Sequence, residues 1–432
     1  MKVTKITHCR LCESKDLLPV FSLQPTPVGD YYMRKDSHPE KLERYPLNVF
    51  LCKKCGHSQL DALVDPGEIY SKYLYTTSVS LGLAEHFVNY ADTVCKKLNL
   101  AANSLVVDIG SNDGTLLRAF KQKGMRVLGV DPAKAIAERA TASGIPTINA
   151  FFDPQIAAQI RREHGGAALV IANNVVANVP NPTEFVRGVG VLLSEQGHFV
   201  WETGYVKYLT EGLVFDNIHH EHIDYYAVRP LIEFYRKLGL ALFDVEVSNS
   251  KGSSIRCYVA RASVKRAVSP AVRTLIAHEE SHGYFTPAPY RRLTQKLEAT
   301  RIELHRLLTD WRKQGKTVAG YGAAIGVTTV LYQFDLGELI DVLIDDNPVR
   351  AGLHSPGYAI PVTGPEKLSA ADSPDYVLIL AWRYSDPIIA RNPYYLAKGG
   401  TFVRILPEIE VVTQDTAKAA GVTPPPFVVS PR

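Results

Sequence analysis

Residues 105–117 carry the pattern that most constrains the fold of this chain. The apolar run Leu105–Ile109 is interrupted only by Asp108, and it is followed by Gly110, by Gly114 and then by a helical pattern. Short apolar runs of this kind are typical of buried parallel strands. The glycines allow the backbone to approach another backbone, or a ligand, closely. The segment is therefore predicted to form a strand, a tight turn and a helix.

A second apolar run, Val127–Val130, ends at Asp131 about one strand–helix unit further along the chain. A carboxylate at the tip of the second strand of such a unit is suited to bind the two hydroxyls of a ribose. The two runs together predict an α/β site for a cofactor that contains adenosine.

The glycine spacing discriminates between adenosine cofactors. The dinucleotide fingerprint G-x-G-x-x-G is not matched. Instead, Gly110-x-x-x-Gly114 resembles motif I of the S-adenosylmethionine-dependent methyltransferases. Acidic and carbonyl oxygens suit the sulfonium and ammonium groups of that cofactor, whereas a pyrophosphate prefers bare N–H groups at a helix start. The residues expected to contact S-adenosylmethionine are Asp108, Gly110, Asn112, Asp113, Gly114, Asp131 and Asn173, with Phe151 and Phe152 beside the adenine.

Length and composition restrict the class of protein. A chain of 432 residues is too long for one core, so two or three domains are expected. Hydrophobic content of 46% with 21% charged residues is typical of a soluble globular protein, and a net charge of +4 does not indicate nucleic acid. The chain has no long apolar run, and its start lacks the apolar region of a secretory signal. We expect a cytoplasmic protein without a membrane span.

Four of the six cysteines form two C-x-x-C pairs, Cys9 with Cys12 and Cys52 with Cys55. In a cytosolic chain such pairs indicate a zinc site rather than disulfides. Four thiolates close the coordination sphere, so the zinc is expected to be structural, and such sites contribute on the order of 10 kcal/mol to folding. His8 and His57 flank the pairs as possible alternative ligands.

The chain is predicted to be an α/β protein with a small zinc-binding module, a methyltransferase domain and a second, C-terminal α/β domain. The expected strands of the methyltransferase domain are Leu105–Ile109, Arg126–Val130, Ala168–Ala172, His198–Glu202, Ala241–Val247 and Ile255–Ala260, the last two as an edge hairpin. The expected partition is 1–66, zinc module; 67–262, methyltransferase domain; 263–312, helical connector; 313–415, Rossmann-like domain; and 416–432, tail.

The segment FDNIHHEHIDYY crowds His219, His220, Glu221 and His222 into four positions. A solvated loop, a metal site and an acid/base site are all compatible with this composition. Acid/base work is favoured, because histidine titrates near neutrality and an adjacent glutamate can hold one imidazole tautomer.

The whole chain resembles the nucleotide-sugar C-methyltransferases that act on 4-keto deoxysugars. The matching segments are CRLC, CKKC, YLYTTS, DIGSNDGTLL, GVDP, IANN, FDNIHHEH, KGSSIR, GYGAA and LAW, in the order of the family. The resemblance implies a class I methyltransferase domain and a C-terminal Rossmann-like domain that helps to hold the nucleotide. It also implies base-catalysed enolisation of a keto sugar, followed by methyl transfer to carbon.

The resemblance assigns roles to individual positions. It makes His222 the base, with Glu221 and His219 beside it and Tyr73 or Tyr75 near the sugar. The expected substrate-binding residues are Asn174, Lys251, Arg256, Tyr321, Trp382 and Arg383. A small-molecule substrate, no nucleic-acid or membrane partner, and a monomer or weak homodimer are expected.

Three positions depart from the family pattern. His219 replaces a tyrosine, Lys251 replaces a histidine, and the GAAIGV turn lacks the lysine of GAxAK. These changes indicate a different sugar, nucleotide or carrier. The alternatives are an O- or N-methyltransferase on the same scaffold, a C-methyltransferase of a non-sugar ketone, and a zinc-dependent nucleic-acid-binding protein.

Overall fold

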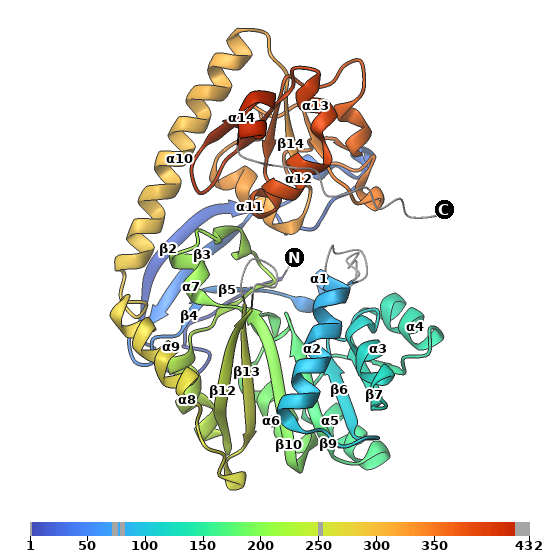
Figure 1. Cartoon of the computed structure of the whole chain (residues 1–432). Coiled ribbons are helices and arrows are strands. Elements are labelled where there is room, and N and C mark those ends of the chain that lie inside the picture. Colours follow the sequence, from blue (N-terminus) through green and yellow to red (C-terminus); the bar gives the residue numbers. More distant parts are fainter. Residues whose placement is uncertain (1, 71–76, 78–82, 249–253, 420–432) are drawn as a thin grey trace. The chain divides into compact units, whose positions relative to one another are not determined.

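The computed structural model describes residues 2–70, 77, 83–248 and 254–419. The chain divides into two compact units, whose elements are labelled in Figure 1. The first unit comprises Met1–Val20, Val49–Thr210 and Glu221–Pro289, and the second comprises Phe21–Asn48, Glu211–His220 and Tyr290–Arg432.

This partition differs from the one predicted from sequence in three segments. Residues 21–48 and 211–220 group with the C-terminal unit, because side chains of that unit bind their backbone. The Thr328 hydroxyl donates to the Gly29 carbonyl at 2.8 Å, and the Thr329 hydroxyl donates to the Ile218 carbonyl at 3.0 Å. Residues 263–289, expected to be part of a connector, belong to the first unit.

A seven-stranded sheet organises the first unit, in the order β12-β13-β10-β9-β6-β7-β8. Its strands are β6 (Leu105–Ile109), β7 (Arg126–Asp131), β8 (Thr147–Asn149), β9 (Ala167–Asn173), β10 (Leu193–Gly204), β12 (Leu240–Ser248) and β13 (Ser254–Arg261). The first five run parallel, and β13 and β12 form the predicted antiparallel edge hairpin. The chain order reverses between β6 and β9, and ligands of open α/β sheets bind at such a switch point.

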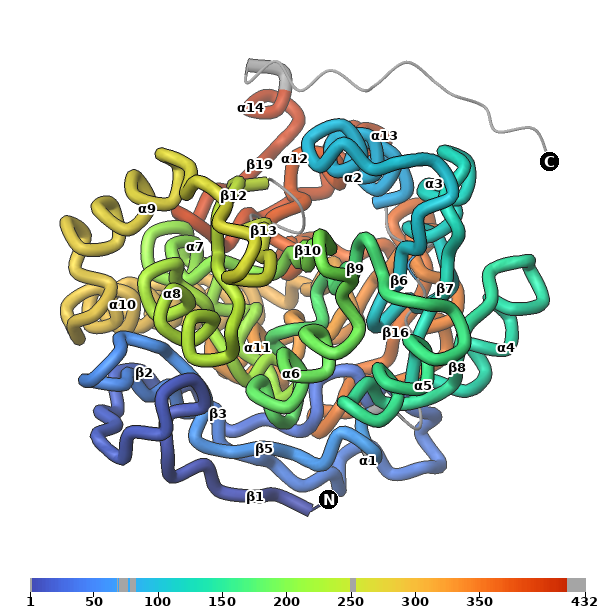
Figure 2. The backbone as a smooth tube through the Cα atoms, turned by 90° about the horizontal axis from the view of Figure 1, so that it is seen from below, coloured from blue at the N-terminus to red at the C-terminus, as the bar shows by residue number. Residues whose placement is uncertain are grey.

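Helices cover both faces of this sheet. The helices of this unit are α1 (Pro66–Tyr70), α2 (Leu83–Leu98), α3 (Thr115–Gln122), α4 (Lys134–Ala142), α5 (Pro154–His164), α6 (Pro182–Leu192), α7 (Val206–Thr210), α8 (Val228–Lys237) and α9 (Pro270–Ser281). Helices α2 and α3 lie on one face, and α5 and α6 lie on the other (Figure 2). Helix α2 buries a stripe at helical spacing, including Leu83, Phe87 and Tyr90, against Val106 and Leu169 of the sheet.

The N-terminal cysteine segment contributes strands to two small antiparallel sheets. β1 (Val3–Lys5) pairs with β5 (Ala62–Val64), and a four-stranded sheet has the order β11-β4-β3-β2. These strands are β2 (Leu17–Thr26), β3 (Tyr45–Cys52), β4 (Ser58–Leu60) and β11 (Asp224–Tyr225). Strand β11 directly follows the histidine motif in sequence, so that motif is tied to the cysteine segment by strand pairing.

The second unit contains a six-stranded sheet in the order β16-β15-β14-β17-β18-β19. Its elements are α10 (Ala288–Lys313), β14 (Val318–Tyr321), α11 (Ile325–Gln333), β15 (Val342–Ile344), β16 (Val362–Thr363), β17 (Tyr376–Ile379), α12 (Ser385–Arg391), α13 (Pro393–Ala397), β18 (Thr401–Arg404), β19 (Glu410–Val412) and α14 (Gln414–Ala419). The strands are parallel except β19, which agrees with the second α/β fold expected from the sequence.

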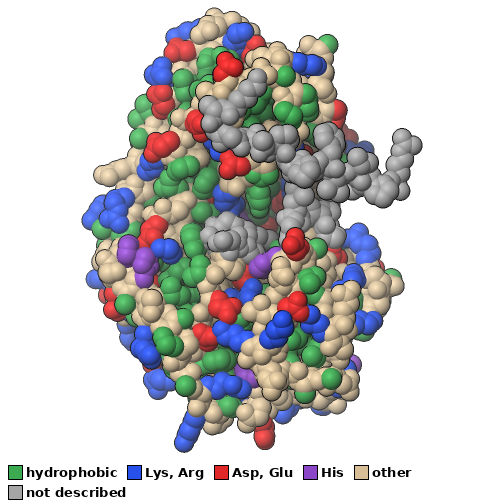
Figure 3. Space-filling view, in the orientation of Figure 1, with side chains coloured by type: hydrophobic (Ala, Val, Ile, Leu, Met, Phe, Trp, Pro, Cys, Tyr) green, Lys and Arg blue, Asp and Glu red, His purple; other side chains and the backbone are tan. Residues whose placement is uncertain are grey.

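Charged side chains of both signs are interspersed over the face of the molecule shown in Figure 3. Within the described residues, no helix combines the length and the apolar composition needed to cross a membrane.

Glu279 on α9 joins three elements of the first unit and is fully buried. Its carboxylate accepts the N–H groups of Val228 and Arg229, at the start of α8, and the hydroxyl of Tyr205. Hydrogen bonds to a charged group are worth about 1.5–3 kcal/mol each. Removal of the carboxylate would leave three buried donors without an acceptor.

We expect Glu279→Ala to lower the free energy of unfolding by about 2–4 kcal/mol, because it orphans the buried donors. The matched control is Glu280→Ala, since the Glu280 side chain is 54% exposed and forms a long, 3.5 Å ion pair with Arg229. Glu280→Ala should lower the free energy of unfolding by less than about 1 kcal/mol. Urea titrations followed by circular dichroism measure both, and equal losses would contradict the prediction.

Candidate functional site: a cofactor cavity and a four-cysteine centre

The turn after β6 brings two backbone segments into close contact at Gly110. Gly110 has a φ of 72°, and its N–H donates to the Val130 carbonyl at 2.7 Å. A Cβ at this position would lie 2.3 Å from Cγ2 of Val175. Because no side chain fits at that distance, position 110 requires glycine for both its conformation and its space.

Asp131 anchors the same turn from the end of β7. Its Oδ2 accepts the Asn112 N–H and its Oδ1 accepts the Ala133 N–H, both at 2.8 Å. Burial raises the pKa of Asp131, and these two N–H groups oppose the increase. Burial, reinforced by the charge of Asp131, raises the pKa of Asp108 well above its usual value. Each carboxylate oxygen of Asp131 keeps a lone pair for a ligand hydroxyl.

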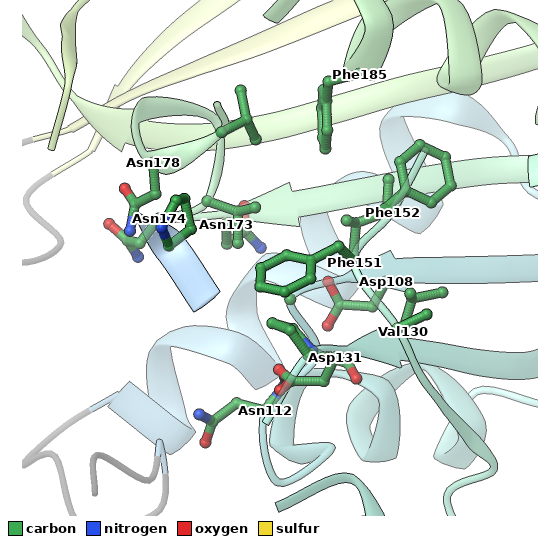
Figure 4. A pocket seen from close by; sticks show the side chains of 18 of the residues that line it. Asp108, Asn112, Val130, Asp131, Phe151, Phe152, Asn173, Asn174, Asn178 and Phe185 are labelled. Carbon is green, nitrogen blue, oxygen red and sulfur yellow. Dashed lines mark hydrogen bonds between the residues drawn. The ribbon is translucent and has the colours of Figure 1, made fainter. Parts of the chain in front are cut away.

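A cavity of about 320 Å³ opens beside this turn, at the carboxyl ends of β6, β7 and β9 (Figure 4). Its volume lies in the range of small-molecule sites. Seven of the residues expected to contact the cofactor line it: Asp108, Gly110, Asn112, Asp131, Phe151, Phe152 and Asn173. Asn174, a predicted substrate residue, lines it as well. The residues predicted from the glycine spacing and the strand ends therefore come together around one cavity.

One wall of the cavity is aromatic. Phe152 and Phe185 pack edge to face with ring centroids 5.5 Å apart, and Phe151 is 48% exposed (Figure 4). A flat apolar wall of this kind favours an adenine ring.

The polar side of the cavity contains groups that can bind a ligand. The side-chain oxygen of Asn173 and the hydroxyl of Ser111 are buried without a hydrogen-bond partner among the described residues. Buried polar atoms are normally paired, so such orphans indicate that a ligand supplies the partner. Together with the Asp131 carboxylate, these donors and acceptors fit the hydroxyl, ammonium and carboxylate groups of S-adenosylmethionine.

Asp113 and Gly114, also predicted to contact the cofactor, do not line the cavity. The Asp113 carboxylate accepts the Thr115 hydroxyl at 2.6 Å, at the start of α3. Gly114 has a φ of 76°, and a Cβ there would lie 2.9 Å from Ile145. In this structure both residues shape the turn, and their contact with a cofactor remains a prediction.

Several cavity residues were not predicted from the sequence. They are Pro66, Thr77, Leu83, Phe87, Ile109, Ser111, Leu116, Val130, Pro132, Ala150, Asp153, Val175, Asn178, Val179, Pro180, Asn181, Glu184 and Phe185. The apolar members lie at ordinary core spacings, which do not distinguish a packed core from a cavity wall. Thr77 has a backbone role, because its N–H donates to the Asn112 side chain at 2.9 Å. Asn178 stands in the IANNVVANVP run and could have been included from that signal.

A buried ionic cluster lies next to the cavity at the end of β10. Glu202 accepts from His86 at 2.9 Å and from Arg256 at 2.7 Å. Burial acts to raise the pKa of Glu202, but the His86 hydrogen bond and the Arg256 charge outweigh it and lower the pKa. Arg256 also lies 4.1 Å from the ring centre of Tyr90. Arg256, a predicted substrate residue, is therefore held in a buried ion pair and does not line the cavity.

The four predicted metal ligands come together in the same unit. The Sγ atoms of Cys9, Cys12, Cys52 and Cys55 all lie within 4.8 Å of one another. The distances Cys9–Cys55 and Cys12–Cys52 are 3.5 and 3.6 Å. Tetrahedral zinc with Zn–S bonds of about 2.3 Å needs sulfurs about 3.8 Å apart, so the cluster fits structural zinc. His57 is not part of it, because its Nε2 lies 2.8 Å from Asp224.

The histidine motif divides between the two units. His219 and His220 belong to the second unit and are buried, and burial lowers the pKa of His220 to about 4. Glu221 and His222 belong to the first unit, Glu221 buried and His222 half-buried. His222 does not line the cavity, but the N–H of the next residue, Ile223, donates at 2.7 Å to the carbonyl of Ala177, beside the cavity residue Asn178.

Three predicted site residues, Tyr73, Tyr75 and Lys251, lie outside the described residues. The remaining three belong to the second unit. The Tyr321 hydroxyl donates to Asp346 at 2.8 Å, and Arg383 donates to Asp216 at 2.8 Å. The buried indole N–H of Trp382 has no acceptor among the described residues.

We expect Gly110→Ala to weaken binding of S-adenosylhomocysteine more than about tenfold. The left-handed backbone alone costs about 1–2 kcal/mol for alanine, and the contact with Val175 adds to it. Gly124→Ala is the control, because Gly124 has a φ of 77° and a Cβ there would meet nothing within 4 Å. Calorimetric titration measures both variants, and unchanged affinity in Gly110→Ala would exclude this turn as the cofactor site.

Comparison with known proteins agrees with this architecture. Residues 9–70 match a putative zinc binding domain, residues 85–245 match a methyltransferase domain, and residues 249–407 match the C-methyltransferase C-terminal domain. Solved structures with a partial likeness include magnesium protoporphyrin IX methyltransferase of Synechocystis, at 13% identity over 46% of this chain and 98% of that chain, TM-score 0.34. An S-adenosylmethionine-dependent methyltransferase of Clostridium acetobutylicum has 14% identity over 41% and 92%, TM-score 0.34.

The likeness to one curated protein extends over nearly the whole chain. The C-methyltransferase NovU of Streptomyces niveus is 33% identical over 415 residues, which is 96% of this chain and 99% of NovU. The likeness therefore spans both compact units. The chain belongs to the family of S-adenosylmethionine-dependent C-methyltransferases that join a zinc-binding domain, a methyltransferase domain and a C-methyltransferase C-terminal domain.

Proposed function

We propose that this enzyme methylates carbon next to the keto group of a deoxysugar that is linked to a nucleotide. The observation that carries the proposal is the end-to-end similarity to a C-methyltransferase, combined with a cofactor cavity next to the segment that ends in His222. Methylation at carbon needs a carbon nucleophile, and a proton next to a carbonyl is acidic enough for a positioned base to remove.

In the proposed mechanism His222 removes that proton. An imidazole is suited to this step because its pKa lies near neutrality. The Tyr225 hydroxyl donates to the His222 carbonyl at 2.9 Å, and the Ile223 N–H is bonded to Ala177, so the backbone on the C-terminal side of the base is fixed. Glu221, directly before it, is the candidate to orient the imidazole. When bound, S-adenosylmethionine supplies the methyl group, and S-adenosylhomocysteine is left.

The enolate formed by proton removal needs a hydrogen-bond donor at its oxygen. The tyrosines Tyr73 and Tyr75 are the candidates that the family resemblance provides. Among the described residues, Asn174 is the candidate donor, because it lines the cofactor cavity and an amide N–H donates without adding charge.

The C-terminal unit is the proposed holder of the nucleotide. Its β14 ends in a glycine turn that resembles the cofactor turn: a glycine with positive φ is followed by an N–H group that is bound by an aspartate at the end of the neighbouring strand. Gly322 has a φ of 117°, and the next residue, Ala323, donates its N–H to Asp345 at 2.6 Å, at the end of the neighbouring strand β15. The indole N–H of Trp382, three residues after the end of β17, has no acceptor among the described residues, which supports a polar ligand in this unit.

The substrate proposal is tested with carbon-13 methyl-labelled S-adenosylmethionine and a panel of keto nucleotide-sugars. We expect label on a carbon next to the keto group, located by nuclear magnetic resonance. Label on oxygen or nitrogen, or transfer only to a ketone that is not a sugar, would reject the proposed substrate.

The base is tested separately by hydrogen exchange. In heavy water with S-adenosylhomocysteine, the enzyme should exchange the acidic proton of the accepted sugar without methylating it. His222→Ala should slow this exchange by about 10²–10⁴-fold, the usual contribution of a positioned base. Affinity for S-adenosylhomocysteine should change less than about twofold, because His222 does not line the cavity.

His164→Ala is the control for the exchange experiment, since its side chain is 37% exposed on α5. It should exchange at the wild-type rate. Full exchange in His222→Ala would assign the base to another residue, and no exchange in the wild-type enzyme would reject enolisation itself.

A further inference from the structure

The zinc knuckle formed by Cys9 and Cys12 carries a buried arginine. Arg10 follows the first ligand directly, and its side chain is only 6% exposed. Its backbone N–H donates at 2.8 Å to the side chain of Gln59, whose amide in turn donates to the His8 carbonyl at 3.0 Å. The knuckle turn therefore fixes where the Arg10 side chain begins.

The guanidinium of Arg10 reaches two other segments of the first unit. Its Nε donates to both carboxylate oxygens of Asp224, at 2.9 and 3.0 Å. Its terminal nitrogens donate to the backbone carbonyls of Pro180, at 2.9 Å, and of Val179. A planar fork with five N–H groups can satisfy such a set, and lysine cannot, because its ammonium is a single point.

The acceptors of Arg10 belong to functional segments. Val179 and Pro180 line the cofactor cavity, in the loop between β9 and α6. Asp224 stands two residues after His222 and also binds His57 Nε2 at 2.8 Å. Strand β11, which holds Asp224, pairs with β4 directly after the second cysteine pair. One side chain thus joins the cysteine centre to the cavity wall and to the segment after the histidine motif.

If Arg10 only neutralised the buried Asp224, its guanidinium would not have to bind any other segment. The two carbonyls of Val179 and Pro180 are what point to positioning, because both residues lie in the connection between β9 and α6. This connection, residues 174–181, contains only one short 3-10 helix, Val176–Asn178. Val179 and Pro180 follow that helix, so Arg10 holds the part of the connection that regular structure leaves unsupported.

We propose that Arg10 is a positioning residue through which the four-cysteine centre holds the wall of the cofactor cavity. Zinc fixes the knuckle, the knuckle fixes Arg10, and Arg10 fixes the loop at Val179 and Pro180. The affinity for the cofactor therefore depends on the metal, although the metal ligands do not line the cavity.

The test compares Arg10→Lys with the wild-type enzyme in the full-length chain. Calorimetry gives the affinity for S-adenosylhomocysteine, mass spectrometry gives the zinc content, and thermal unfolding reports on the fold. We expect the variant to keep one zinc per chain and to bind S-adenosylhomocysteine about tenfold more weakly. Wild-type affinity in a zinc-loaded Arg10→Lys would overturn the proposal.

The matched control is Lys53→Ala. Lys53 lies inside the other knuckle, between Cys52 and Cys55, and makes an exposed ion pair with Asp16 at 3.3 Å. It should keep both zinc and cofactor affinity. A loss of affinity equal to that of Arg10→Lys would show that any change in the knuckles acts generally, and it would overturn the role of Arg10.

Metal removal supplies a measurement that does not depend on the variant. Wild-type enzyme stripped with a chelator should lose about tenfold in affinity for S-adenosylhomocysteine and regain it when zinc is added back. Stripping Arg10→Lys should cause little further loss, because the connection is already broken. Unchanged affinity in the stripped wild-type enzyme, or a full second loss in the stripped variant, would contradict the proposal.

Discussion

The close approach of the turn at Gly110 to the end of β9 is the constraint on which the cofactor site depends. The sheet order reverses there, so two strand ends diverge and leave space above them. Gly110 lets the first turn pass against Val175, and Asp131 ties the turn to the next strand through the Asn112 N–H. The cavity and its aromatic wall follow from that packing.

The sequence predicted the residues whose type is unusual for their position. Examples are Asp108 within an apolar strand, Asp131 at the tip of the next strand, and the paired cysteines. Such residues are costly to bury or are conspicuous in the sequence, and the structure places them in the cavity or the metal cluster. Leu83, Phe87 and Phe185 line the same cavity but were not predicted. Their spacing along α2 and α6 is that of any buried helix face, so their position could be known only from the fold.

Long-range contacts account for the other differences. No local pattern singles out Arg10, and only the folded chain shows that its acceptors lie at Val179, Pro180 and Asp224. Likewise, no local pattern shows that Gly29 and Ile218 are bound by Thr328 and Thr329 of a distant helix. The histidine motif reads as one segment, yet the bond between His220 and Glu221 joins the two units.

The chain passes from one unit to the other five times, near residues 20, 48, 210, 220 and 289. No single cut therefore separates the two units, and a fragment that starts at residue 313 leaves behind Asp30, the partner of Arg350, and Asp216, the partner of Arg383. A gene chimera with one crossover would likewise mix both units from two parents. Exchange of substrate specificity between relatives requires several junctions, placed at these passages rather than at the borders of the sequence motifs.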